Sequence, residues 1–229
     1  MTLKIGLPSK GRLMDKTFAW FTQRGVEMRP SGDGREYKAH AGIDGLEIVL
    51  LSAGEIPREL GAGRIHLGVP GTDVVRDRLA AWETQVVEIA ALGFGHADLV
   101  IAVPRFWVDV DTMHDLDAVA AACRQTHGQR LRIATKYHRL VREFLRAEGV
   151  ADYRLVDSQG ATEGTVRNLT AEAIADITST GETWRANHLK PLSDGVILKS
   201  QATLFKSRRA QWTGAERKAL AALVDQIEA

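Results

Sequence analysis

The chain has 229 residues, of which 45% are hydrophobic and 26% are charged. These proportions are typical of a globular protein with apolar side chains for one large core or two small ones, and they exclude a disordered or fibrous chain. Thirty basic and 29 acidic residues leave a net charge of +1, so no overall field favours nucleic acid or an anionic membrane surface. An anionic ligand would have to be bound by local groups.

The first residues, MTLKIGLPSKGR, lack the basic segment and long apolar run of a signal peptide. No window approaches the roughly 18 consecutive apolar residues of a membrane span. We therefore expect a cytoplasmic protein without membrane contact. Cys123 is the one cysteine, which excludes an internal disulfide, and Cys123 with His127 lacks the further ligands that a zinc site needs. We expect Cys123 to be structural.

Strand and helix patterns alternate from the first residues. Residues 3–8 (LKIGLP) predict a strand, and Met14, Phe18 and Phe21 then form the apolar stripe of an amphipathic helix that Gly25 stops. This strand-then-helix unit is the building block of α/β proteins.

The same unit recurs twice in the first half of the chain. Residues 46–52 (LEIVLLS) predict a strand, and Ser52-Ala-Gly-Glu55 is a capping box for a short helix that ends near Gly61. RIHLGVP and GTDVVRDRLA then repeat the alternation.

The middle of the chain indicates a passage between two domains. In residues 86–104, VVEIAALGFGHADLVIAVP, two apolar strands flank Gly93-Phe-Gly95-His96. A fresh series follows in LRIATKY, HRLVREFLRAEG, YRLVDS, EAIADI and GVILKSQATLFKS, and Thr213-Gly-Ala-Glu216 opens a capped terminal helix. We predict an α/β fold of two lobes with mainly parallel sheets and flanking helices, and the cleft between such lobes is a usual ligand site.

The segment AIADITSTGETWRAN, residues 173–187, is the strongest candidate for chemistry. A strand ending at Asp176 would place the following loop at the carboxyl edge of a sheet, where open α/β folds bind ligands. Gly181 permits a tight turn, and a helix beginning near Thr183 would add its dipole. Hydroxyl groups that could donate to phosphate oxygens belong to Thr178, Ser179, Thr180 and Thr183. The alternative is a solvated surface turn.

Two further loops follow predicted strands. Ser9-Lys10-Gly11-Arg12 lies at a helix start, where Arg12 could clamp a pyrophosphate, although exposed Lys and Arg also form ordinary surface turns. In GVPGTDVV, Gly71 and Asp73 again follow a strand, and Asp73 taken alone fits a helix-start acid better than a ligand group.

Asp176, followed by Thr-Gly four and five residues later and by Thr at seven, resembles the phosphoribosyl pyrophosphate loop of phosphoribosyltransferases, with Ala175 in place of the usual second acid. In order along nearly the whole chain, LPSKGR, GDGREY, GVPGTD, RIATKY, GATEG and DITSTGETWRANHLK resemble the ATP phosphoribosyltransferase family, which catalyses the first step of histidine biosynthesis. Because the chain ends soon after the helix at Glu216, it resembles the short-form catalytic subunit.

The resemblance implies a two-lobed fold similar to type II periplasmic binding proteins. One lobe would comprise residues 1–95 together with 185–229, and the other would comprise residues 96–184. The loop from Asp176 to Thr183, with Glu182, would hold the ribose and the 5′-phosphate. Lys10, Arg12 and Arg35 would act on the pyrophosphate. The other substrate-binding positions are Gly71, Asp73, Thr135, Lys136, Tyr137 and Glu163.

The implied reaction joins N1 of ATP to C1 of phosphoribosyl pyrophosphate and releases pyrophosphate, with Mg²⁺ carried by the substrate and no protein metal site. The implied partners are a histidyl-tRNA-synthetase-like regulatory subunit in a hetero-oligomer and a second catalytic subunit in a homodimer. Where many members of the family have an arginine before the second predicted helix, this chain has Ser52 and Glu55. Trp184 stands where Leu is more usual.

Two other functions are compatible with parts of the sequence. A phosphoribosyltransferase for another base shares the late loop but does not predict LPSKGR or GVPGTD. A non-catalytic solute-binding protein of the same two-lobed shape would also close on an anion, but the expected lack of a signal peptide argues against it.

Overall fold

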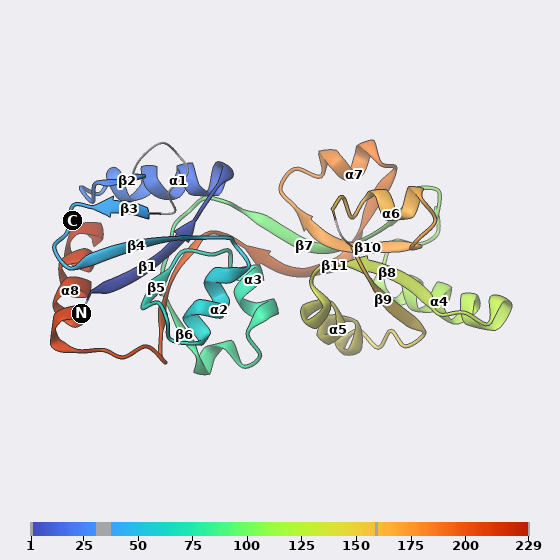
Figure 1. Ribbon diagram of the computed structural model, residues 1–229. Helices are drawn as coiled ribbons and strands as arrows, with labels where there is room; N and C mark the ends of the chain where they lie inside the picture. Colours follow the sequence, from blue (N-terminus) through green and yellow to red (C-terminus); the bar gives the residue numbers. More distant parts are fainter. Residues whose placement is uncertain (1, 31–37, 159, 229) are drawn as a thin grey trace. The chain divides into compact units, whose positions relative to one another are not determined.

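The computed structural model describes residues 2–30, 38–158 and 160–228. It divides into two compact units, one formed by Met1–Gly95 with Gln201–Ala229 and the other by His96–Ser200 (Figure 1). The prediction of two α/β lobes is confirmed. The chain leaves the first unit after Gly95, which coincides with the expected boundary at residue 95. It returns after Ser200 rather than after residue 184, because β11 (Leu189–Ser200) pairs with β7 (Ala97–Pro104) of the second unit.

The first unit is built on a mixed sheet with the strand order β2-β3-β4-β1-β5-β12-β6. Its strands are β1 (Leu3–Pro8), β2 (Met28–Pro30), β3 (Lys38–Ala41), β4 (Leu46–Leu51), β5 (Leu67–Gly68), β6 (Val86–Ala91) and β12 (Thr203–Ser207). Strand β1 runs parallel to both of its neighbours, β4 and β5. The carboxyl ends of β1 and β5 therefore lie side by side at one edge of the sheet.

Helices cover both faces of this sheet. Its helices are α1 (Gly11–Thr22), α2 (Glu55–Gly61), α3 (Thr72–Arg78), the 3-10 turn η1 (Trp82–Thr84) and α8 (Gly214–Glu228). Phe18 and Phe21 of α1 are buried against the inner residues of β1, together with Leu223 of α8, so the predicted apolar stripe is confirmed. A separate cluster joins α2 and α3 to Phe205 of β12.

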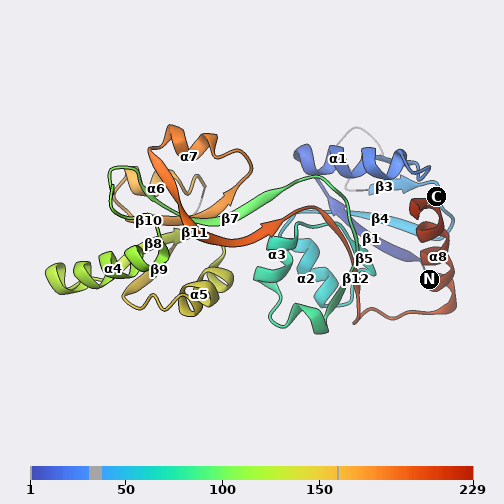
Figure 2. The same ribbon diagram turned by 180° about the vertical axis from the view of Figure 1, so that it is seen from behind.

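The second unit has a sheet of order β11-β7-β10-β8-β9, with β8 (Leu131–Thr135), β9 (Tyr153–Asp157) and β10 (Ala173–Thr178). Helices α6 (Gly164–Arg167) and α7 (Glu182–Ala186) lie on one face, and α4 (Met113–His127) and α5 (His138–Ala147) lie on the other (Figures 1 and 2). Trp184 of α7 is buried against Val100 and Ile174 of the sheet. The larger side chain at position 184 is thus accommodated in this core.

Both sheets are mixed, which corrects the expectation that they are mainly parallel. The parallel pairs are β1–β4, β1–β5, β8–β9 and β8–β10, and the other described pairs are antiparallel. Two of the antiparallel pairs follow from the connections between the units. The chain leaves through β6 and β7 and returns through β11 and β12, so β6–β12 and β7–β11 necessarily run in opposite directions.

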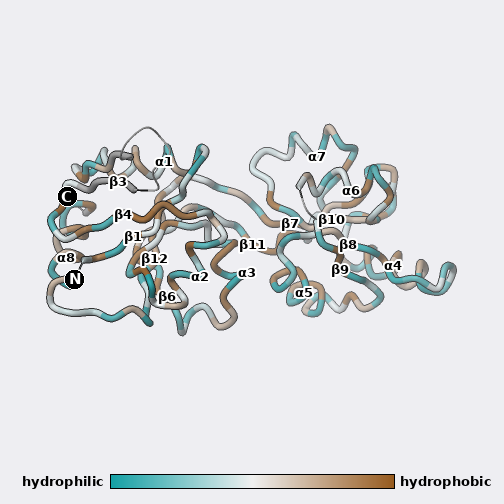
Figure 3. Tube along the Cα trace, viewed as in Figure 1, coloured by the Kyte–Doolittle hydropathy of each residue, from teal (hydrophilic) through white to brown (hydrophobic). Residues whose placement is uncertain are grey.

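Acidic side chains accept hydrogen bonds from backbone amides just before two helices, although the N-cap of α2 is Gly54 rather than Ser52. The Glu55 carboxylate accepts a hydrogen bond from the Ser52 amide at 2.8 Å before α2, and Glu216 accepts one from the Thr213 amide at 3.0 Å before α8. In Figure 3 the hydrophobic stretches follow strands such as β4, in keeping with their buried positions. Among the described residues, no helix has the length and apolar character needed to cross a membrane.

Candidate active site

The loop between β10 and α7 lies at the carboxyl end of β10, as the sequence predicts for its Thr-rich segment. The strand continues past Asp176 to Thr178, and α7 begins at Glu182. Gly181 adopts φ +69°, a left-handed conformation that costs a residue with a Cβ atom free energy. A glycine at this position therefore allows the chain to turn directly from the strand into the helix.

Hydroxyl groups in this loop accept hydrogen bonds from its own amides. The Gly181 amide donates to Thr178 Oγ1 at 2.8 Å, and the Glu182 amide donates to Thr180 Oγ1 at 3.3 Å. The Ser179 hydroxyl donates to the His96 carbonyl at 2.9 Å, which ties the loop to the start of the second unit. The amides thus already point toward oxygen acceptors, an arrangement that suits an incoming phosphate oxygen.

Asp176 and Thr178 lie two residues apart on β10 and so share one face of the strand. The Asp176 side chain is buried, with 9% of its surface exposed, and its Oδ1 accepts a hydrogen bond from the Ile177 amide at 2.8 Å. This bond leaves the carboxylate with further acceptor capacity for a ligand hydroxyl.

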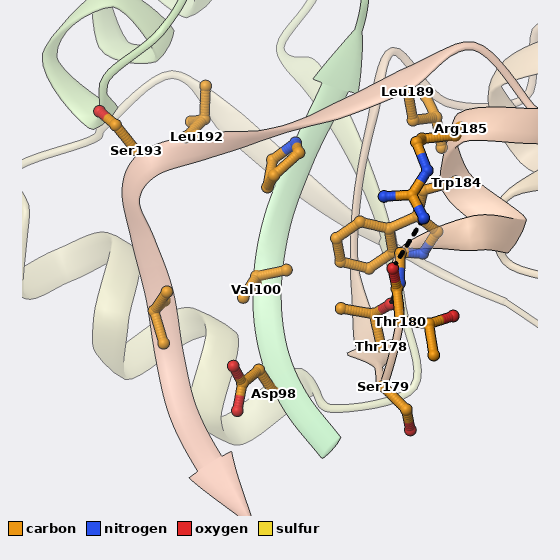
Figure 4. Close-up of a pocket in the computed structure, with 13 residues that line it drawn as sticks. Asp98, Val100, Thr178, Ser179, Thr180, Trp184, Arg185, Leu189, Leu192 and Ser193 are labelled. Atoms are coloured by element: carbon orange, nitrogen blue, oxygen red, sulfur yellow. Dashed lines mark hydrogen bonds between the residues drawn. The ribbon is translucent and has the colours of Figure 1, made fainter. Parts of the chain in front are cut away.

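A pocket of about 460 Å³ opens beside the loop (Figure 4). One wall is the run from Thr178 to Gly181, followed by Trp184 and Arg185. Opposite it are residues of β7 and β11, including Asp98 and Val100. Four predicted site residues share this pocket, namely Thr178, Ser179, Thr180 and Gly181, whereas Asp176, Glu182 and Thr183 do not line it.

Arg185 was not among the residues that the sequence singled out. Its Nη2 donates to the Thr180 carbonyl at 3.0 Å, and Figure 4 shows the guanidinium group directed at the loop. The available signal was its position as the first basic residue after the Thr-rich run.

Other predicted residues lie at the same edge of the second sheet. Thr135 ends β8 and pairs with Ala175 of the adjacent parallel strand β10, so it lies next to Asp176 along the edge. Its hydroxyl oxygen accepts from the Tyr137 amide at 2.9 Å, which turns the chain into α5. Lys136 is exposed and donates to the Gly160 carbonyl at 2.6 Å.

Two acidic side chains also lie near the carboxyl edge of the second sheet. Glu163 is half-buried and directly precedes α6. Asp157, at the end of β9, lies 2.6 Å from His138 Nε2. Sequence reasoning did not single out His138 and Asp157, because these residues become neighbours only through the pairing of β8 with β9.

The first unit holds the remaining predicted residues. Lys10 and Arg12 follow β1 at the start of α1, and both side chains are exposed and have no partner among the described residues. Gly71 and the buried Asp73 follow β5 at the start of α3. Because β1 and β5 are parallel neighbours, these loops share one edge of the sheet. Arg35 lies outside the described residues.

One ion pair links β8 to β10, the strand that precedes the Thr-rich loop. Arg132 Nη2 donates to Glu172 Oε1 at 2.5 Å, and the Arg132 amide donates to Glu172 Oε2 at 2.7 Å. Burial raises the pKa of Glu172, but the bonds from Arg132 outweigh it, and the net shift of this pKa is downward. The pair joins the start of β10 to β8.

No cluster of three or more His, Cys, Asp or Glu side chains suited to a metal ion occurs in the part of the chain that the structure describes. Cys123 is half-buried on α4.

Comparison with solved structures defines the class of fold. The chain matches the ATP phosphoribosyl transferase (HisG:HisZ) complex from Thermotoga maritima with a TM-score of 0.73 and 20% identity, covering 99% of this chain and 97% of that chain. It matches a mutant of ArgBP from T. maritima with a TM-score of 0.52 and 14% identity, covering 99% of this chain and 89% of that chain. The fold is therefore the two-lobed α/β fold shared with type II periplasmic binding proteins.

Comparison of sequences defines the family. Residues 52–229 match the family model described as HisG: ATP phosphoribosyltransferase. The ATP phosphoribosyltransferase of Cereibacter sphaeroides is 74% identical over 216 residues, which cover 94% of this chain and 92% of that protein. That of Mesorhizobium japonicum is 51% identical, covering 93% of each chain. The chain belongs to the ATP phosphoribosyltransferase family, pentosyltransferases of the first step of histidine biosynthesis, and the resemblance seen in its motifs is confirmed.

Proposed function

We propose that this chain transfers the phosphoribosyl group of phosphoribosyl pyrophosphate to N1 of ATP. The bond from N1 to C1 of the ribose forms, the bond from C1 to the pyrophosphate oxygen breaks, and the products are N1-(5-phosphoribosyl)-ATP and pyrophosphate. The observation that carries the proposal is 74% identity to an ATP phosphoribosyltransferase across 94% of the chain. The ordered motifs of the sequence support it.

In this proposal the Thr-rich loop of the second unit binds the phosphoribosyl end of the substrate. Asp176 accepts hydrogen bonds from the ribose diol, and phosphate oxygens take the place of the hydroxyl acceptors that now bond the Gly181 and Glu182 amides. The loop hydroxyls and Thr183 at the first turn of α7 add further donors. The support is that each of these two amides donates to a hydroxyl oxygen of the loop, and that the loop follows the strand that carries the buried Asp176 carboxylate.

Lys10, Arg12 and Arg35 act on the pyrophosphate in the same proposal. Negative charge grows on this leaving group as the bond to C1 breaks, so cations placed there stabilise the transition state more than the ground state. The side chains of Lys10 and Arg12 support this role, because they lie exposed at a helix start and have no partner in the described part of the chain. No covalent nucleophile is needed, because the oxocarbenium-like transition state depends on position and charge.

The other family positions contribute contacts to the substrates. Gly71 and Asp73 lie at the same sheet edge as Lys10, and Thr135, Lys136, Tyr137 and Glu163 lie at the edge that carries Asp176. Mg²⁺ arrives bound to the pyrophosphate as part of the substrate and offsets its charge.

We further propose that the chain is the short-form catalytic subunit, that it pairs with a second copy of itself, and that it works in the cytoplasm. Its regulatory partner would be histidyl-tRNA-synthetase-like. The similar structure from T. maritima is described as a HisG:HisZ complex, which supports a two-component enzyme.

The experiment that separates an enzyme from a binding protein measures pyrophosphate release in the presence of Mg²⁺. We expect release only when ATP and phosphoribosyl pyrophosphate are both present, with or without the regulatory subunit. Binding of either compound with no release under any of these conditions would favour a solute-binding protein.

A further inference from the structure

Arg185 is the basic residue of the segment from 173 to 187, which otherwise carries the acids Asp176 and Glu182. A phosphate monoester brings a further charge of about −1.5 to −2 at pH 7. Backbone amides and hydroxyls can bond such a group, but they do not neutralise it. A loop with two acids therefore needs a cation from nearby.

The guanidinium group of Arg185 is placed where that charge is needed. Its Nη2 donates to the Thr180 carbonyl at 3.0 Å, and the side chain lines the pocket beside the loop (Figure 4). A Cβ atom built on Gly181 would lie 3.3 Å from Arg185 Nη1, so the group lies against the turn itself. Arg185 has no carboxylate partner in the described part of the chain, so its charge is not neutralised within it.

We propose that Arg185 is a positioning residue for phosphoribosyl pyrophosphate. This inference rests on the proposed function. By holding the Thr180 carbonyl, the guanidinium fixes the 180–181 peptide so that the amides of Gly181 and Glu182 stay on the ligand side of the loop. The positive charge of the guanidinium lies close to the phosphate, and its other N–H groups remain available as donors.

Planar geometry explains why arginine suits this place. A guanidinium can donate to a carbonyl with one nitrogen while its remaining donors and its charge stay available. A lysine keeps the charge but lacks the rigid fork, and a glutamine keeps one N–H donor but lacks the charge. These two variants therefore separate the effect of the hydrogen bond to the Thr180 carbonyl from the effect of the charge.

The test compares steady-state kinetics of Arg185→Ala, Arg185→Lys and Arg185→Gln in the complete enzyme. For Arg185→Ala we expect the KM for phosphoribosyl pyrophosphate to rise by about 10- to 100-fold, as for loss of a charged contact. The KM for ATP and kcat should change by less than about threefold, a difference that general damage to the fold would not produce. Arg185→Lys should recover part of the loss, and Arg185→Gln should recover less.

Arg124 provides a matched control in the same unit. Its Nη1 donates to the Gly128 carbonyl at 2.9 Å at the end of α4, so Arg124→Ala removes the same kind of bond away from the pocket. This control should leave both KM values unchanged. Faster amide hydrogen exchange at Gly181 and Glu182 in Arg185→Ala, but not in Arg124→Ala, would directly support the positioning of these amides by Arg185.

The outcomes separate this inference from the proposed function. A wild-type enzyme that forms no product would contradict the proposed function itself. A working wild type, with the KM for phosphoribosyl pyrophosphate of Arg185→Ala within about twofold of normal, would overturn the role of Arg185 alone. An equal loss of affinity for both substrates would also overturn it. If Arg185→Ala does not fold, the lysine and glutamine variants are judged by the same criteria.

Discussion

The hydroxyl of Thr178 accepts a hydrogen bond from the Gly181 amide at 2.8 Å, so the turn at the end of β10 is closed by its own side chain. Such a closed turn depends on the left-handed backbone of Gly181, at φ +69°. A hydroxyl oxygen thus occupies the position that the proposal gives to a phosphate oxygen. In the proposal, an oxyanion binds in this loop without any lysine.

Gly181→Ala should weaken phosphoribosyl pyrophosphate binding. The added Cβ strains the left-handed backbone by about 1–2 kcal/mol and would lie 3.3 Å from Arg185 Nη1. We expect a lower melting temperature together with a higher dissociation constant in a calorimetric titration. Gly128→Ala is the control, because Gly128 has φ +67° with no atom within 4 Å of the added Cβ. The prediction fails if both variants keep normal affinity.

Arg12→Ala should slow the chemical step. The cation stabilises charge that develops on pyrophosphate, so its loss should lower the single-turnover rate by about 10- to 100-fold. The KM for phosphoribosyl pyrophosphate should change less. Lys16→Ala, which removes an exposed cation one turn further along α1, should leave the rate unchanged. Equal single-turnover rates for Arg12→Ala and the wild type would refute the role of Arg12.

Glu172→Gln should destabilise the protein at neutral pH by about 1–2 kcal/mol, since it removes a charge-assisted pair with Arg132. The pKa of Glu172 is lowered in the folded state, so its contribution is fully present above the unfolded pKa of about 4.3. That contribution is lost as the pH falls through the folded value. Denaturant unfolding should therefore show a gap between wild type and variant at pH 7 that narrows below about pH 4. A gap independent of pH would contradict this account.

The strands and the edge that carries the site could be predicted from sequence, because apolar runs and the glycines and hydroxyls after them are local signals. Residues 3–8 and the Phe18–Phe21 stripe illustrate this. The sense of strand pairing could not be predicted in the same way. Whether β12 pairs with β6 depends on where the chain re-enters the first unit, which no local pattern records.

Candidate residues divide in the same manner. The Thr178–Gly181 turn could be predicted, because the glycine and the hydroxyl residues that form it lie close together in the sequence. The contact of Arg185 with the Thr180 carbonyl depends on a side-chain rotamer, and the contact of His138 with Asp157 depends on strand register. Motifs therefore predict the candidate loop, but they do not predict the side-chain contacts that the fold brings to it.

Histidine should inhibit the complex of this chain with its regulatory subunit and have almost no effect on the isolated chain. The proposal places the effector site on the partner, so inhibition requires coupling between two chains. A histidine titration of activity with and without the partner tests this. Strong inhibition of the isolated chain at the histidine concentrations that inhibit the complex would place the effector site on this chain instead.

The most direct test of the central claim is the identity of the product formed from Mg²⁺, phosphoribosyl pyrophosphate and an equimolar mixture of ATP and adenine. Mass spectrometry and NMR of the product should show a phosphoribosyl group attached to N1 of ATP, with one pyrophosphate released for each molecule formed. A product in which free adenine, rather than ATP, carries the phosphoribosyl group would contradict the assignment.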